Sequence, residues 1–163
     1  MLCPGLRLIS DTEGRSQFSL WCILAAPLML GIDVRKASAF TLATIGNMEA
    51  IAIDQDPLGV QGMAYTPSVP PPGNVTYYYK PLAPTKCAQS IAIAILNRGP
   101  KGVPGQNVSF MDIGFPAAQW IVVRDIWADT TLPPTQSFFF TRAIDSHETL
   151  LLKITPLCGM GQS

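Results

Sequence analysis

A chain of 163 residues is long enough to bury a hydrophobic core, as one domain or as two small ones. Eleven basic residues balance eleven acidic ones, which argues against a nucleic-acid-binding surface. Only 13% of the residues are charged, which predicts either a large buried fraction or surfaces that contact other protein.

The most apolar stretch covers residues 18–32, with Pro27 inside it. It is shorter than the roughly 20 residues that a membrane-spanning helix needs. A secretion signal is not expected either, because Asp11 and Glu13 precede the run and no small-residue cleavage site follows it. We therefore interpret the run as the interior of a folded domain.

Residues 15–26 are predicted to form a helix with Phe18, Cys22 and Ala25 on one face, ended by Pro27. Residues 27–33 predict a short strand covered on both faces. Ser38 then caps a helix over residues 39–56, which Gly46-Asn47 breaks in two. Helix, buried strand and helix in this order indicate an α/β architecture.

Asp33 follows the predicted strand directly. In α/β barrels, active-site residues lie at the carboxyl ends of strands, so Asp33 is a candidate site residue. An aspartate here also suits a cap of the next turn, and both interpretations stay open.

Beyond residue 62, short β-branched or alternating runs predict an antiparallel β-sandwich. In "SIAIAIL", Ile91, Ile93 and Ile95 share one face, and the alanines leave the other face thin enough for close packing. The six predicted strands are residues 75–82, 90–96, 107–113, 120–127, 137–144 and 149–155.

Few residues of this region indicate chemistry. His147 adjoins Asp145 and Ser146, but neighbours on a strand point to opposite faces and cannot form a catalytic triad, so we expect a structural role. Asp54 and Asp56 flank Gln55, but Asp56 precedes Pro57 in a turn and resembles backbone chemistry rather than part of an acid/base pair.

The remaining polar and aromatic candidates have structural interpretations too. Arg124 and Asp125 are expected to form edge or cross-strand pairs. Aromatic residues in strands are more often core than sugar platforms, and this applies to Trp127, Tyr77, Tyr78 and Tyr79.

The four cysteines, Cys3, Cys22, Cys87 and Cys158, lack Cys-x-x-Cys spacing, so three disulfide pairings stay open and neither a metal site nor a cofactor is expected. Asn74-Val75-Thr76 and Asn107-Val108-Ser109 are glycosylation sequons, which matter only if the chain enters the secretory pathway.

Five segments together resemble one family: "FSLWCILAAPLMLGIDVR", "EAIAIDQDPLGVQG", "AIAILNRG", "VVRDIW" and "HETLLLKIT". In this order they are similar to the carboxy-terminal part of α-galactosidases (melibiases) of glycoside hydrolase family 27. The resemblance implies an α/β plus all-β chain, in which residues 1–61 are the last units of a (β/α)8 TIM barrel and residues 62–163 are an antiparallel β-sandwich domain.

Family members are retaining glycosidases that use one aspartate as nucleophile and a second as acid/base. The resemblance places both upstream of Met1, so no catalytic residue is expected here and the chain alone is expected to be inactive. The methionine of the family's Asp-Met-Leu motif corresponds to Met1, which with Asp33 is a candidate substrate-binding residue.

The resemblance implies a galactoside substrate and a possible homodimer for the full-length parent, and a secreted or lysosomal location. It does not separate galactose from N-acetylgalactosamine specificity. We expect neither nucleic acid nor a membrane span. Two alternatives remain: a stand-alone carbohydrate-binding or interaction module without catalysis, and a membrane-associated chain anchored by residues 18–32.

Overall fold

The computed structural model describes residues 1–5, 8–84 and 89–158. Helices come first along the chain: α1 (Asp11–Ile23), the 3-10 turn η1 (Val34–Lys36), α2 (Ala39–Ile45) and α3 (Met48–Asp54). Strands and a second 3-10 turn follow: β1 (Met63–Tyr65), β2 (Val75–Pro84), β3 (Gln89–Asn97), β4 (Asn107–Ser109), η2 (Met111–Ile113), β5 (Ile121–Asp125), β6 (Thr130–Thr131), β7 (Phe138–Phe140) and β8 (Thr149–Pro156).

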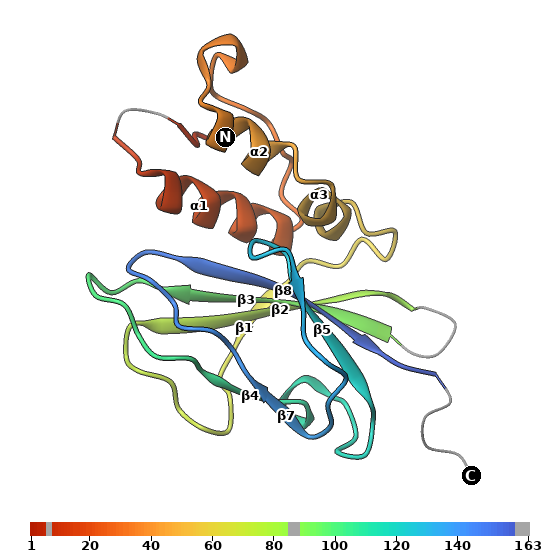
Figure 1. Cartoon of the computed structure of the whole chain (residues 1–163). Helices are drawn as coiled ribbons and strands as arrows, with labels where there is room; N and C mark the ends of the chain where they lie inside the picture. Colours follow the sequence, from red (N-terminus) through yellow and green to blue (C-terminus); the bar gives the residue numbers. More distant parts are fainter. Residues whose placement is uncertain (6–7, 85–88, 159–163) are drawn as a thin grey trace.

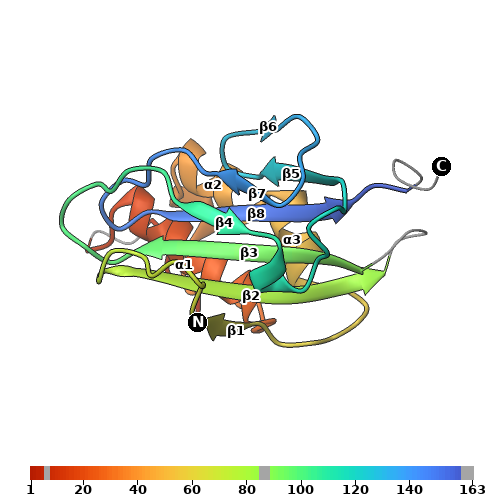
Figure 2. The ribbon, with the colours of Figure 1, turned by 90° about the horizontal axis from the view of Figure 1, so that it is seen from below.

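The strands form two antiparallel sheets. The larger has the order β1-β2-β3-β8-β5-β6, and the smaller consists of β4 and β7. The three helices cover one face of the larger sheet, and the β4–β7 pair covers the opposite face (Figures 1 and 2). The predicted antiparallel β-sandwich is confirmed, with the helices as an additional outer layer.

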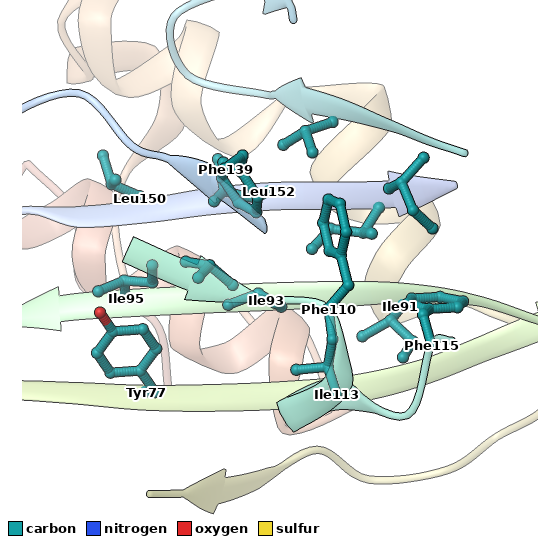
Figure 3. Close-up of a cluster of buried hydrophobic side chains, with 14 of the residues drawn as sticks. Tyr77, Ile91, Ile93, Ile95, Phe110, Ile113, Phe115, Phe139, Leu150 and Leu152 are labelled. Atoms are coloured by element: carbon teal, nitrogen blue, oxygen red, sulfur yellow. The ribbon is translucent and has the colours of Figure 1, made fainter. Parts of the chain in front are cut away.

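Strand β3 separates two hydrophobic cores. Its isoleucines Ile91, Ile93 and Ile95 point toward the small sheet, where Phe110 and Phe139 pack against each other with ring centroids 5.7 Å apart (Figure 3). Its alanines face the helices, on the face that was predicted to be thin enough for close packing. We call the first cluster the sandwich core; its buried members are Val75, Tyr77, Ile91, Ile93, Ile95, Val108, Phe110, Ile113, Phe115, Ile121, Val123, Phe139, Ile144, Leu150, Leu152 and Ile154.

The second cluster, which we call the helix–sheet core, lies between α1, α3 and the sheet. Small side chains on β3 let α1 approach the sheet closely, because an alanine projects only one carbon from the backbone. Its buried members are Leu2, Phe18, Cys22, Ile23, Ala50, Ile53, Leu82, Ala92, Ala94, Ile126 and Leu151.

The first helix differs from the prediction at both ends. It begins at Asp11 because Ser10 and Glu13 form a capping box, in which Ser10 Oγ accepts from the Glu13 amide and Glu13 Oε2 accepts from the Ser10 amide. It ends at Ile23, before Pro27, and Ala25 lies beyond it with φ 50. Pro27 therefore does not end α1, and Ala25 is not on its buried face.

Residues 27–33 do not form the predicted strand covered on both faces. Leu30 makes a single parallel bridge to Leu2, and the side chain of Met29 is 68% exposed. By contrast, the break predicted in the next helix is confirmed: Ser38 caps α2, and Asn47 caps α3 directly after Gly46.

The predicted strands are present but differ in extent. Of residues 107–113 only Asn107–Ser109 pair as a strand, and η2 follows. Strands β1 and β6, of three and two residues, were not predicted. None of the described helices has the length and apolar character needed to cross a membrane.

Candidate functional site

The candidate substrate contacts Met1 and Asp33 lie in the two segments that a parallel bridge between Leu2 and Leu30 joins. The Leu2 amide donates to the Met29 carbonyl at 2.8 Å, and the Gly31 amide donates to the Leu2 carbonyl at 2.7 Å. Leu2 itself is fully buried, so it anchors this segment in the helix–sheet core. The bridge brings two segments 28 residues apart side by side in parallel orientation.

Met1 lies against the residue that follows the bridge. A Cβ placed on Gly31 would be 2.7 Å from Met1 Cγ, so the glycine leaves the room that the methionine occupies. The side chain of Met1 remains 73% exposed. Asp33 follows two residues after Gly31 in the chain.

Asp33 caps η1 and is held by Arg35. Its Oδ1 accepts from the Arg35 amide at 3.1 Å and from Arg35 Nε at 2.9 Å, while Oδ2 accepts from Nη2 at 2.9 Å. These hydrogen bonds hold the pKa of the Asp33 carboxyl below its ordinary value. The ionised carboxylate can therefore accept a hydrogen bond from a hydroxyl group, but it is unsuited to donating a proton near neutral pH.

Asp56 acts on the backbone, as predicted. Its Oδ1 accepts from the Leu58 amide at 3.0 Å within its own turn, and both oxygens accept from the Ala83 amide on β2. Asp54 lies at the end of α3, where burial raises the pKa of its carboxyl. Asp54 and Asp56 therefore lie in different environments.

Arg124 and Asp125 were expected to form edge or cross-strand pairs, and the cross-strand alternative is wrong. In register, Arg124 lies opposite Lys153, and its guanidinium instead binds Glu49 of α3 at 2.7 Å and also Asp129. Asp125 binds Arg142, which follows β7, at 3.0 Å. Sequence spacing missed these partners because each comes from outside the sheet.

His147 lies in a turn and not on a strand, with φ 59. Its Nδ1 is 3.9 Å from Glu13 Oε1, and its carbonyl accepts from Ser16 Oγ at 2.7 Å. The turn thus contacts α1, which agrees with a structural role.

The aromatic candidates belong to the cores. Tyr77 is buried in the sandwich core and Tyr79 packs against it, whereas Tyr78 and Trp127 pack against the helix–sheet core. Trp127 Nε1 donates to Ser19 Oγ at 2.8 Å, so this ring ties the sheet to α1. These side chains serve packing, as the sequence analysis favoured.

Lys80 is a buried charged residue that the sequence analysis did not single out. Although fully buried, its ammonium donates to the carbonyls of Ile53 at 2.5 Å, Asp54 at 3.2 Å and Cys22 at 3.4 Å. These carbonyls end α3 and α1, where the helix dipole favours a cation. Burial lowers the pKa of Lys80, and the nearby Asp54 carboxylate opposes that shift. The alternation of β2 offered a signal, since it places Lys80 on the inward face shared by Tyr78 and Leu82.

Within the described ranges, no group of three or more His, Cys, Asp or Glu side chains could hold a metal ion.

A pocket of about 250 Å³ lies between α3 and the sheet, lined in part by Glu49, Asp56 and Lys153. Cys158 is disulfide-bonded, whereas Cys3 and Cys22 are free.

Comparison with known proteins identifies both parts of the chain. A family described as "Alpha galactosidase C-terminal beta sandwich domain" matches residues 72–154, and one described as "Alpha galactosidase A" matches residues 1–56. The α-galactosidase of Coffea arabica is 32% identical over 96% of this chain and 39% of its own length. That of Cyamopsis tetragonoloba is 33% identical over 96% of this chain and 36% of its own length.

Solved structures agree on the fold. α-Galactosidase I from Mortierella vinacea has a TM-score of 0.79 and 22% identity, covering 94% of this chain and 38% of that one. A β-L-arabinopyranosidase from Geobacillus stearothermophilus has a TM-score of 0.73 and 24% identity, covering 94% of this chain and 32% of that one. The chain spans well under half the length of these relatives. Because the sandwich family alone matches half of its residues, the chain belongs to the α-galactosidase (melibiase) family.

Proposed function

We propose that this chain is the carboxy-terminal part of a retaining α-galactosidase that hydrolyses terminal α-linked galactose. In this proposal residues 1–61 contribute the last units of a (β/α)8 barrel, and residues 62–163 form its β-sandwich domain. A homodimer of the whole protein stays a prediction.

The parallel bridge between Leu2 and Leu30 is the observation that carries the barrel assignment. The two bridged segments are connected through α1, which is the crossover that parallel strands require. In a barrel of this kind the residues just after such a strand face the active site. Asp33 occupies that position after Leu30.

Retaining glycosidases use two carboxyl groups about 5 Å apart, one as nucleophile and one as acid/base. We assign neither role to a residue of this chain; Asp33 serves a cap, Asp56 binds backbone amides and Asp125 forms an ion pair. We propose instead that ionised Asp33 accepts a hydrogen bond from a sugar hydroxyl and that Met1 contacts the apolar face of the sugar.

A chimera tests this proposal. The segment of the Coffea arabica enzyme that precedes its matched region is joined to this chain, and turnover of an aryl α-galactoside is measured for the chimera, the chain alone and the plant segment alone. We expect turnover only by the chimera. A chimera that unfolds cooperatively but has no activity would overturn the assignment.

The roles of Asp33 and Met1 are tested in the same chimera. Asp33→Asn removes the carboxylate charge at nearly constant shape, and we expect kcat/KM to fall about tenfold or more, consistent with the roughly 1.5–3 kcal/mol of a charged hydrogen bond. Asp11→Asn, in the first turn of α1, is the control and should leave kcat/KM unchanged. In the chimera Met1 is no longer the first residue, so Met1→Ala can be made and compared directly with the unmodified chimera. An unchanged kcat/KM in either site variant would refute the role of that residue.

A further inference from the structure

The two glycosylation sequons have different structural settings. Asn74 is exposed in the turn that leads into β2. The turn is held by its backbone, since the Val75 amide donates to Pro72 and the Arg98 amide donates to Asn74, each at 2.8 Å. The side chain of Asn74 is therefore not needed to maintain the turn.

Asn74 is exposed, and the residue before it faces open space. A Cβ added to the preceding residue, Gly73, would have no heavy atom within 4 Å. On the other side the Asn74 amide packs against Gly99, since a Cβ there would be 3.0 Å from Asn74 Nδ2. The loop between β1 and β2 also runs on the side of the sheet away from the helices (Figure 1). An oligosaccharide here would extend into solvent without displacing either core.

Asn107 begins strand β4 and pairs in register with Phe140 of β7. The residue is only partly exposed, and its Oδ1 is out of contact with solvent. Ser109, the third residue of the sequon, is also partly buried and lies opposite Phe138. A glycan on Asn107 would lie beside this buried oxygen, on a residue that is paired within the small sheet.

The disulfide at Cys158 supplies an independent observation about the compartment. Disulfides persist in secreted proteins and in the lumen of the secretory pathway, and there asparagine sequons are modified. We infer that Asn74, and not Asn107, carries an N-linked oligosaccharide.

The donor is a lipid-pyrophosphate-linked oligosaccharide of the secretory pathway. The Asn74 amide nitrogen forms a bond to the anomeric carbon of the first sugar, the bond from that carbon to the pyrophosphate oxygen breaks, and the lipid pyrophosphate leaves. The displaced amide proton passes to a base of the transferase. No redox step is involved. The modification does not depend on the proposed glycosidase activity, so each can fail without the other.

The test expresses the full chain behind a heterologous secretion signal in a eukaryotic cell. Both the secreted and the intracellular protein are treated with peptide-N-glycosidase and compared by electrophoresis and peptide mass spectrometry. We expect a single glycosidase-sensitive shift, with the converted aspartate mapped to position 74. Asn74→Gln and Thr76→Ala should abolish the shift, whereas Thr76→Ser, which retains a sequon, should keep it.

Asn107→Gln and Ser109→Ala are the matched controls and should leave the shift intact. Three results would overturn the inference: no glycan in either fraction of the wild type, a shift that survives Asn74→Gln, or a converted aspartate at position 107. Because the intracellular fraction is also analysed, a variant that is retained in the cell still gives a result.

Discussion

Replacing Lys80 by methionine should destabilise the protein although it removes a buried charge. The variant keeps the apolar stem of the side chain and deletes only the ammonium that contacts the ends of α1 and α3. Its carbonyl partners lie 26 to 58 residues away along the chain, so the loss affects packing between the helices and the sheet.

The magnitude follows from two opposing contributions. A buried polar group that loses its partner costs about 1–3 kcal/mol, and the close contact to Ile53 and the longer one to Asp54 are both lost. The variant also buries no ammonium, so the desolvation free energy of that charge is absent and part of the loss is offset. We expect Lys80→Met to lower the free energy of unfolding by about 2 kcal/mol and Tm by about 4–8 °C.

Urea and thermal denaturation followed by circular dichroism measure both quantities. The control is Lys153→Met, because Lys80, Ala92 and Lys153 lie in one row across β2, β3 and β8 and Lys153 is exposed. The control should stay within about 0.5 kcal/mol of the wild type. If Lys80→Met proves as stable as Lys153→Met, the ammonium does not hold the helix ends and the reasoning is refuted.

Three further predictions concern the same part of the molecule. Burial lowers the pKa of Lys80 from 10.5, so as pH rises the folded state loses this proton before the unfolded state does. The stability of the wild type relative to Lys80→Met should therefore rise as pH approaches about 10.5. A stability difference that stays flat or falls in urea titrations contradicts this. Gly62→Ala should cost about 1–3 kcal/mol, because the new Cβ would lie 2.6 Å from the Ile23 carbonyl oxygen, whereas Gly73→Ala, with nothing within 4 Å, should be nearly neutral; equal melting temperatures of the two variants would show that the backbone yields. Burial raises the pKa of the Cys22 thiol to about 12, so at pH 8 a thiol reagent should label Cys3 in the folded protein and Cys22 only in denaturant, and site-resolved mass spectrometry that finds native labelling at Cys22 would contradict its burial.

Local patterns predicted the elements whose structure depends on neighbouring residues. The alternation in β3 correctly assigned Ile93 and Ala92 to opposite faces, because strand geometry alone sets which side chains share a face. Ser38 was correctly placed as a helix cap, and Gly46-Asn47 as a break, for the same reason. The capping box of Ser10 and Glu13 is equally local, and the late start predicted for α1 overlooked a signal that the sequence contains.

The remaining errors come from interactions across the fold. Strand β6 pairs only two residues with β5, so no hydrophobic period could indicate it. The partners of Arg124 come from α3 and from a loop, and those of Lys80 from the ends of two helices. The apolar run at residues 27–33 predicted a buried strand, yet Met29 is exposed, because composition reports a tendency to be buried and not the presence of a covering layer.

The contacts between the helices and the sheet explain how the sandwich could position the candidate substrate residues. The Gly62 amide donates to the Ile23 carbonyl at 2.9 Å, and Lys80 binds the adjacent Cys22 carbonyl, so the end of α1 is fixed from the sheet side. Leu2 precedes α1 in the chain and Leu30 follows it. The position of their bridge therefore depends on the position of α1. In the chimera, Lys80→Met should therefore reduce kcat/KM for the aryl α-galactoside beyond the effect of Lys153→Met at temperatures where both variants are folded. Equal kcat/KM values would mean that the β-sandwich stabilises the barrel segment without setting the geometry of Met1 and Asp33.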